Sequence, residues 1–182
     1  MAIKATIFKA DLQIADLDRG YYADHSLTLA QQDSETDERL MMRVLAFALW
    51  ADDQLVVARG MIDNEEPEMW IRNLHGDIEH WIDVGQPDPK WLTKASRRSG
   101  KVTLLTYGRS APVWWNANKK DLERLGNLQV LHVPADESSE LARMAQRGMK
   151  LQFTLQEGQT LVVDARGDSL TVSPQPIFVP RQ

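Results

Sequence analysis

Apolar and polar residues alternate along the start of the chain. The alternation covers Ile3–Ile14 and Tyr21–Leu29, and the intervening Asp-Leu-Asp-Arg-Gly has the composition of a turn. A period of two is typical of β-strands that bury one face. The first thirty residues are therefore predicted to form a β-hairpin.

The pattern then changes to the spacing of a helix. Ser34 is a candidate N-cap with Asp37 three residues later, and the residues to about Ala51 favour a helix. Its apolar stripe consists of Met41, Met42, Leu45, Ala48 and Leu49. At about 100° per residue, Glu38 lies within the angular range of this stripe. A carboxylate is thus directed toward the predicted core.

The rest of the chain alternates short apolar runs with helical segments. Predicted strands are Leu55–Met61, Met69–Leu74, Ile78–Val84, Lys101–Tyr107 and Leu128–Val133, followed by a meander over 150–156, 160–165 and 169–173. Predicted helices run from the Asp88-Pro89 cap to about Ser99, from Ala111 to Leu125, and from Asp136 to Arg147. A helix between two apolar strands implies a parallel crossover. The expected fold is one α/β domain over 1–182, with a mixed sheet flanked by helices and a C-terminal β-meander.

Composition narrows the class of protein. The chain has 182 residues, 43% hydrophobic and 26% charged, and no apolar run that approaches the roughly 20 residues of a membrane span. The alternating amino terminus does not resemble a signal peptide, so a soluble cytoplasmic protein is expected. Because there is no cysteine, disulfides, thiolate zinc sites and cysteine nucleophiles are excluded.

Charge is distributed unevenly along the chain. The net charge is -5, yet the segment 89–120 has eight basic residues and no acid, which leaves -13 on the remainder. Such a segment either contacts a polyanion or forms a solvated basic helix face. Candidate nucleic-acid contacts are Lys90, Arg97, Arg98, Trp115 and Lys119. Trp114 and Trp115 could stack on bases, although their helical spacing fits core and rim positions better. The acidic remainder leaves a protein partner open.

Several common chemistries have no basis in the sequence. His25, His75, His80 and His132 are scattered without the spacing of a zinc site. The sequence also has no phosphate-binding glycine loop of an NTPase or dinucleotide enzyme and no Gly-x-Ser-x-Gly elbow of a hydrolase.

Two acids and one lysine remain as candidates for metal-binding or catalytic residues. If Glu38 is buried, it needs a cation, a metal ion or hydrogen-bond donors, or it is protonated. The alternative is a structural pair with an arginine, or exposure at the start of the helix. Asp83 lies near the carboxyl end of an apolar strand, and Lys94 is in the second turn of the next helix. Two carboxylates can hold Mg²⁺ or Mn²⁺ while an ammonium assists an attacking water, which is the chemistry of phosphodiester hydrolysis.

Several stretches resemble the YaeQ family over nearly the whole chain. They are IKATIFKADLQIADLDRGYYADHSLTLA, SETDERLMMRVLAFAL and PEMWIRNLHGDIEHWIDVGQPDPKWLTKAS, with WIDVGQPD followed by KAS as the most distinctive. That family is similar in fold to PD-(D/E)XK phosphodiesterases in a variant topology. The resemblance implies metal ligands at Glu38, Glu68 and Asp83, and catalytic roles for Glu38, Asp83 and Lys94.

This sequence departs from the usual motif at two points. Glu68 replaces the aspartate after proline, and the lysine expected two residues after Asp83 is absent, so Lys94 is its candidate replacement. Asp88 is either a helix cap or a site residue. The resemblance leaves two functions open, a metal-dependent nuclease and a non-catalytic binding or regulatory module that keeps the fold.

Overall fold

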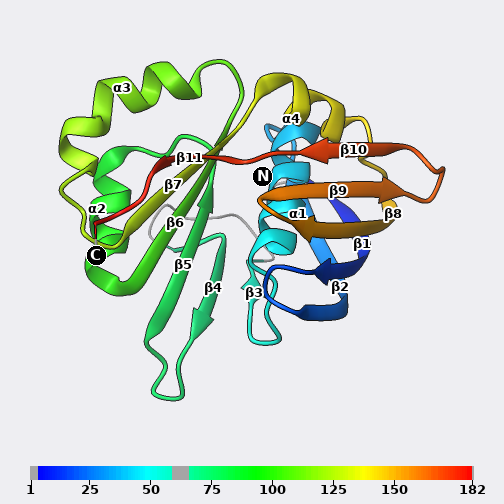
Figure 1. Ribbon diagram of the computed structural model, residues 1–182, viewed down its shortest axis with the longest axis horizontal. Helices are drawn as coiled ribbons and strands as arrows, with labels where there is room; N and C mark the ends of the chain where they lie inside the picture. The colour runs from blue at the N-terminus through cyan, green and yellow to red at the C-terminus, as the bar shows by residue number, and fades with distance from the viewer. Residues whose placement is uncertain (1–3, 59–65, 182) are drawn as a thin grey trace.

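Two β-sheets and four helices make up the molecule, whose computed structural model describes residues 4–58 and 66–181 (Figure 1). The first sheet contains β1 (Ala5–Asp16), β2 (Tyr21–Gln32), β8 (Gly148–Gln156), β9 (Gln159–Asp164) and β10 (Ser169–Val172), in the order β10-β9-β8-β1-β2. The predicted hairpin is its β1–β2 pair. On its other side β1 pairs in parallel with β8, so the C-terminal meander extends the N-terminal hairpin.

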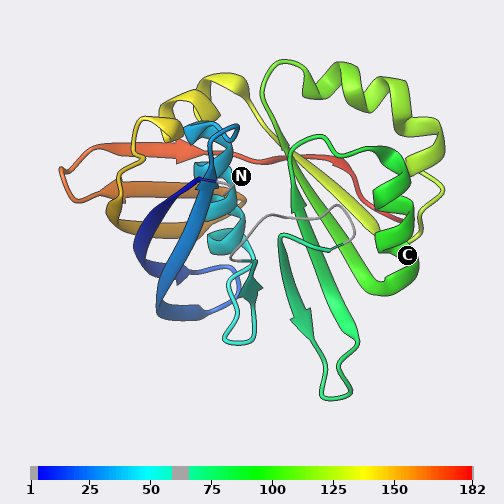
Figure 2. The same ribbon diagram turned by 180° about the vertical axis from the view of Figure 1, so that it is seen from behind.

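The second sheet contains the central strands of the sequence. Its members are β3 (Val56–Val57), β4 (Met69–Arg72), β5 (Ile78–Val84), β6 (Ser99–Tyr107), β7 (Leu128–Val133) and β11 (Gln175–Phe178), in the order β11-β7-β6-β5-β4-β3. β5, β6 and β7 are parallel, as the predicted crossover requires. The crossovers are α2 (Pro89–Arg98) and α3 (Ala111–Leu122), which lie together on the outer face of this sheet (Figure 2).

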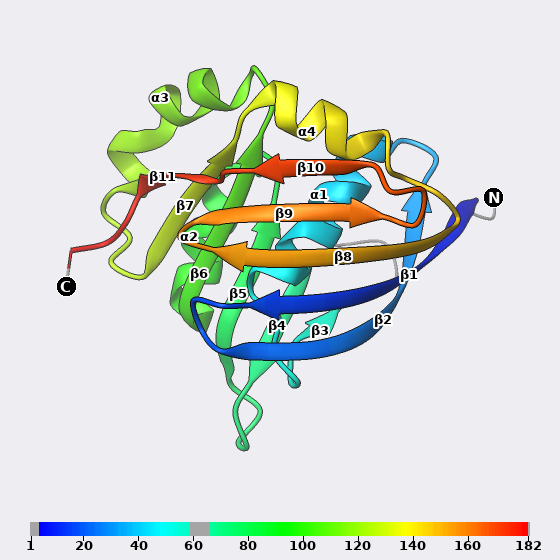
Figure 3. The same cartoon turned by 45° about the vertical axis from the view of Figure 1, so that its right-hand side comes forward.

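The other two helices lie against the first sheet. That sheet curves around α1 (Asp37–Leu49), and α4 (Ala135–Ala142) lies beside α1 (Figure 3). The main core joins α1 and the first sheet to one face of the second sheet, through residues such as Met69, Ile82 and Leu105. A smaller core lies under α2 and α3 and includes Trp81, Leu92 and Trp115. The mixed α/β class with flanking helices is therefore confirmed, with the strands divided between two sheets.

Several elements differ from the sequence prediction. Thr36 caps α1 in place of Ser34, since its hydroxyl accepts the backbone N–H of Arg39 at 3.1 Å. α4 ends at Ala142, where tight turns begin and Met144 enters the main core. β11 was not predicted, because its sequence is interrupted by proline. Of the strand predicted over Leu55–Met61, β3 accounts for Val56–Val57, and the part after residue 58 lies outside the described residues.

None of the helices in the described part of the chain is long and apolar enough to cross a membrane.

Candidate functional site

A cavity of about 980 Å³ lies where three parallel strands end. Its lining comes from the residues that follow β5, β6 and β7, together with the start of α1 and one side of α4. In open α/β sheets, ligands bind beyond the carboxyl ends of the strands. Gly85 and Gly108, with φ of 97° and 83°, allow the chain to turn sharply after β5 and β6.

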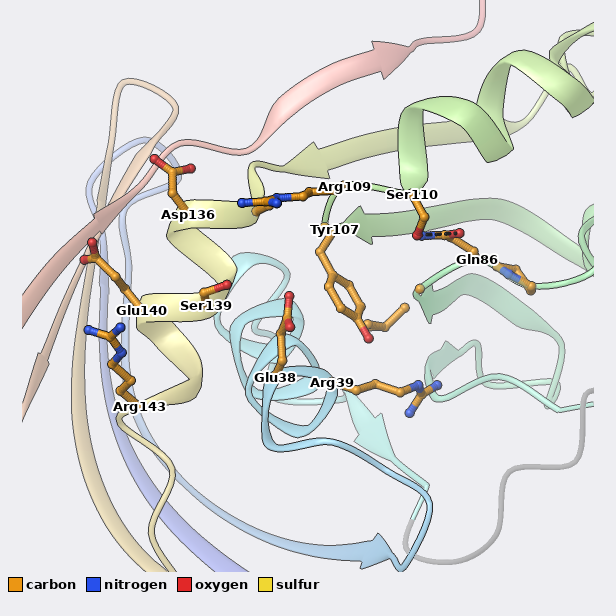
Figure 4. Close-up of a pocket in the computed structure, with 15 residues that line it drawn as sticks. Glu38, Arg39, Gln86, Tyr107, Arg109, Ser110, Asp136, Ser139, Glu140 and Arg143 are labelled. Carbon is orange, nitrogen blue, oxygen red and sulfur yellow. Dashed lines mark hydrogen bonds between the residues drawn. The ribbon is translucent and has the colours of Figure 1, made fainter.

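Charged and polar side chains dominate this cavity (Figure 4). The labelled residues are Glu38, Arg39, Gln86, Tyr107, Arg109, Ser110, Asp136, Ser139, Glu140 and Arg143. Burial raises the pKa of the Tyr107 hydroxyl, which keeps this tyrosine neutral. No ion pair within residues 4–58 and 66–181 involves Arg109 or Arg143. The cavity can therefore offer cationic groups to an anionic ligand.

Glu38 extends from the first turn of α1 into this cavity, beside Tyr107 (Figure 4). Its carboxylate accepts the hydroxyl of Ser138, a fully buried residue of α4, at 2.7 Å. The side chain is half-buried, so it points inward as the helical projection indicated. The hydrogen bond from Ser138 and the contact with the cavity offset the energetic cost of burying the Glu38 carboxylate.

Asp83 and Glu68 come together at the carboxyl end of β5. The backbone N–H of Glu68 donates to one carboxylate oxygen of Asp83 at 3.2 Å, although the two residues are 15 positions apart. The indole N–H of Trp81 donates to the other oxygen at 2.8 Å. Burial raises the pKa of Asp83 to about 6, while the Trp81 hydrogen bond and the charge of Arg39 act against this rise. Asp83 is thus ionised above about pH 6 in a largely desolvated position.

Glu68 is more deeply buried, with 2% of the whole residue exposed. One of its carboxylate oxygens pairs with the guanidinium of Arg39. The other is buried and has no hydrogen-bond partner among the described residues. Glu68, Asp83, Arg39 and Trp91 line a second cavity of about 100 Å³.

Arg39 lines both cavities and was not identified from the sequence. Besides Glu68, it pairs with Glu35 at 3.0 Å, and Glu35 also accepts from the buried Arg43 at 3.2 Å. The spacing of Glu35 and Arg39 is that of an i,i+4 pair, which the sequence does contain. That spacing gives no indication of the longer contact to Glu68.

Lys94 is exposed on α2. Its ammonium lies 4.5 Å from the centre of the Trp91 ring, and Trp91 lines the small cavity. Trp91 therefore connects the predicted lysine to the cavity that contains Glu68 and Asp83.

Asp88 is the N-cap of α2. Its carboxylate accepts the backbone N–H of Lys90 at 3.0 Å, and Pro89 follows at the first helical position.

The predicted nucleic-acid contacts divide into exposed and buried residues. Lys90, Arg97 and Arg98 are exposed on α2, and Lys119 is exposed on the adjacent α3. Trp115 is 7% exposed and its ring centre lies 5.8 Å from that of Phe178. Trp115 thus has the core position that its helical spacing favours, and stacking on a base would require it to leave the core.

The metal-binding potential of the acids rests on two carboxylates. In the part of the chain that the structure describes, no group of three or more His, Asp or Glu side chains is placed to hold a metal ion. Mg²⁺, however, is commonly held by one or two carboxylates together with waters and substrate phosphates. Glu68 and Asp83 both line the small cavity, and one carboxylate oxygen of Glu68 has no hydrogen-bond partner among the described residues, which fits this donor set.

Comparison with known proteins gives consistent similarities. The family model described as YaeQ protein matches residues 1–174. The chain is 41% identical over 180 residues to the Uncharacterized protein YaeQ of Escherichia coli (strain K12), covering 97% of this chain and 99% of the relative. Among solved structures, the YaeQ protein from Xanthomonas axonopodis pv. citri aligns with a TM-score of 0.91 at 43% identity, over 97% of this chain and 100% of the other. The YaeQ protein from Pseudomonas syringae aligns with a TM-score of 0.90 at 38% identity, over 98% of each chain.

Proposed function

The chain belongs to the YaeQ family, and from that premise we propose that it is a magnesium-dependent phosphodiesterase with a PD-(D/E)XK nuclease-like core that acts on nucleic acid. The main support is the hydrogen bond from the Glu68 amide to the Asp83 carboxylate. This bond links Glu68, the acid after proline, to Asp83, the acid on β5. One carboxylate oxygen of Glu68 has no hydrogen-bond partner among the described residues.

The order of elements supports the nuclease-like core. Glu38 lies on α1, Glu68 immediately precedes β4, Asp83 lies on β5, and Lys94 follows on α2. This is the order of helix acid, acid after proline, strand acid and lysine that the sequence resemblance implies. Asp83 lies in the second sheet, Glu68 lies at its margin, and Glu38 and Lys94 lie on helices that contact this sheet.

Each side chain has a role that its position allows. Glu68 and Asp83 would hold Mg²⁺ in the small cavity, and Lys94 would be held by Trp91 near the attacking water. Glu38 lines the large cavity, and the proposal assigns it a contact with the metal through water or the acceptance of a proton from the attacking water. Mg²⁺ would neutralise phosphate charge and lower the pKa of a bound water.

The exposed cations of α2 and α3 support nucleic acid as the substrate. Lys90, Lys94 and Arg97 lie on α2, the helix that begins just after the strand with Asp83. A polyanion bound along α2 would therefore reach the small cavity with its phosphates.

A second function is favoured by a specific observation. Arg39 already supplies a cation to Glu68, and both oxygens of Asp83 have donors from the protein. In a non-catalytic binding or regulatory module, these pairs would be permanent and would stabilise the end of the sheet without a metal.

Calorimetric titration with Mg²⁺ and Mn²⁺ separates the two functions. The proposal predicts that the wild-type protein binds either ion and that Asp83→Ala abolishes binding, with Asp88→Ala as a matched control that leaves it intact. Binding that survives Asp83→Ala would exclude the proposed centre. Hydrolysis of single-stranded and duplex DNA and RNA is then compared between wild type and Asp83→Ala purified in parallel, because only a difference between them excludes a contaminating nuclease.

A further inference from the structure

Arg39 lies between the two cavities. It extends from the first turns of α1 and is labelled in Figure 4 at the side of the large cavity, while Glu68 and Asp83 lie in the small cavity that it also lines. Its side chain is 31% exposed, whereas that of Glu68 is 3% exposed. A partly solvated cation is thus paired with a nearly fully buried anion.

This pairing leaves Glu68 incompletely satisfied. A buried carboxylate requires cations or hydrogen-bond donors on both oxygens, and a guanidinium can supply two parallel donors to one carboxylate. Here Arg39 divides its donors, because one terminal nitrogen contacts Glu68 and the other contacts Glu35 at 3.0 Å. The second oxygen of Glu68 therefore has no donor among the described residues, and a further cation would gain from binding it.

We propose that Arg39 is a built-in competitor of the divalent metal ion for Glu68. When metal binds, the guanidinium leaves Glu68 for the large cavity, where an anionic group of the substrate accepts its hydrogen bonds. This inference rests on the proposed function, because it takes Glu68 as a metal ligand.

The structure has room for the Arg39 side chain in both positions, paired with Glu68 or turned into the large cavity. Arg39 lines the large cavity together with Arg109 and Glu38, so movement away from Glu68 leads into solvent-accessible space. The long side chain has several rotatable bonds, and its partner Glu35 lies four residues earlier, just before α1. An anion that binds released Arg39 must favour metal binding, and metal must favour the anion to the same extent.

The test compares Mn²⁺ affinity in three full-length proteins by calorimetry. Arg39→Gln removes the competing cation, and Arg109→Gln removes one charge from the same large cavity without touching Glu68. We expect Arg39→Gln to bind Mn²⁺ about tenfold more tightly than wild type or better, which corresponds to about 1.4 kcal/mol. Arg109→Gln isolates the general effect of one lost positive charge and is expected to change the affinity much less.

A second measurement uses sodium sulfate as a tetrahedral dianion, with sodium chloride at equal ionic strength as its control. Sulfate should raise the Mn²⁺ affinity of wild type and have no such effect on Arg39→Gln. Circular dichroism and thermal melting confirm that each variant is folded, and Arg39→Lys, which keeps a charge but not the planar fork, provides a further variant if Arg39→Gln unfolds.

The inference is overturned if Arg39→Gln binds Mn²⁺ no more tightly than Arg109→Gln, or not at all. Its failure differs from that of the proposed function. Metal binding that depends on Asp83 but is indifferent to Arg39 contradicts only the inference, whereas tighter binding by Arg39→Gln without any phosphodiester hydrolysis contradicts only the enzymatic proposal.

Discussion

At the scale of single residues, the environment of Asp83 decides its chemistry. The carboxylate is held by a backbone N–H and an indole N–H, both of which favour the ionised form, yet burial outweighs them and raises its pKa to about 6. The group is therefore protonated in mildly acidic solution and ionised at neutral pH. Because a metal ion binds the ionised form, metal affinity should also decline below about pH 6.

This pKa predicts the direction of a pH effect on stability. Between about pH 4 and 6 the folded protein retains the Asp83 proton that the unfolded chain has lost, so the free energy of unfolding falls as pH rises. A shift from 3.8 to about 6 corresponds to about 3 kcal/mol. Asp83→Asn removes this term. In urea titrations without metal, the stability of wild type relative to Asp83→Asn should therefore decrease from pH 4 to pH 7, and parallel pH profiles would contradict the assignment.

The candidate residues were predictable only in part. Glu38, Glu68, Asp83 and Lys94 were accessible from the sequence because their positions match a known family pattern. The contact of Arg39 with Glu68 joins residues 29 positions apart, and neither helical nor strand periodicity extends that far. Phe178, whose ring lies near that of Trp115, is in β11, a strand that proline obscures.

At the scale of elements, local patterns located most helices and strands but not their ends. Asp88-Pro89 identified the start of α2, because a capping side chain is followed directly by a proline at the first helical position. At α1 the sequence offers Ser34 and Thr36 as caps two residues apart, and only the three-dimensional path selects Thr36. The start of α1 matters for the site, since Glu38 and Arg39 both lie in its first turn.

Paired substitutions test this cap. Thr36→Ala should lower the free energy of unfolding by about 1 kcal/mol, because the backbone N–H of Arg39 loses its acceptor. Ser34→Ala serves as the control and should have almost no effect. If denaturant titrations show a larger loss of free energy of unfolding for Ser34→Ala than for Thr36→Ala, Ser34 is the cap.

At the scale of the whole molecule, the two sheets position different parts of the proposed active site. Asp83 lies in the second sheet and Glu68 at its margin, and the outer helices of this sheet carry the exposed residues Lys90, Arg97, Arg98 and Lys119, which form the basic surface. The first sheet packs against α1 and α4, whose residues line the large cavity. The parallel pairing of β1 with β8 connects the two ends of the sequence. No local pattern specifies such long-range pairing, so the division into two sheets was not predictable.

The basic surface predicts how nucleic-acid binding depends on salt. Replacing Lys90, Arg97 and Lys119 together with Gln should weaken binding to duplex DNA and reduce the slope of log affinity against log salt by about 2 to 3. The control replaces Lys9, Arg147 and Lys150, which are exposed on or just before strands of the first sheet. Fluorescence anisotropy at several salt concentrations measures both, and equal slopes for the two triple variants would place the binding surface elsewhere.

The central claim is that Glu68 and Asp83 form a metal centre, and locating Mn²⁺ in a crystal tests it most directly. Crystals grown with MnCl₂ and measured near the manganese absorption edge should show one anomalous peak within about 2.5 Å of carboxylate oxygens of both residues. The Arg39 side chain should then have turned away from Glu68. An anomalous map without a peak between Glu68 and Asp83, with the Arg39–Glu68 pair intact at saturating Mn²⁺, would contradict the account.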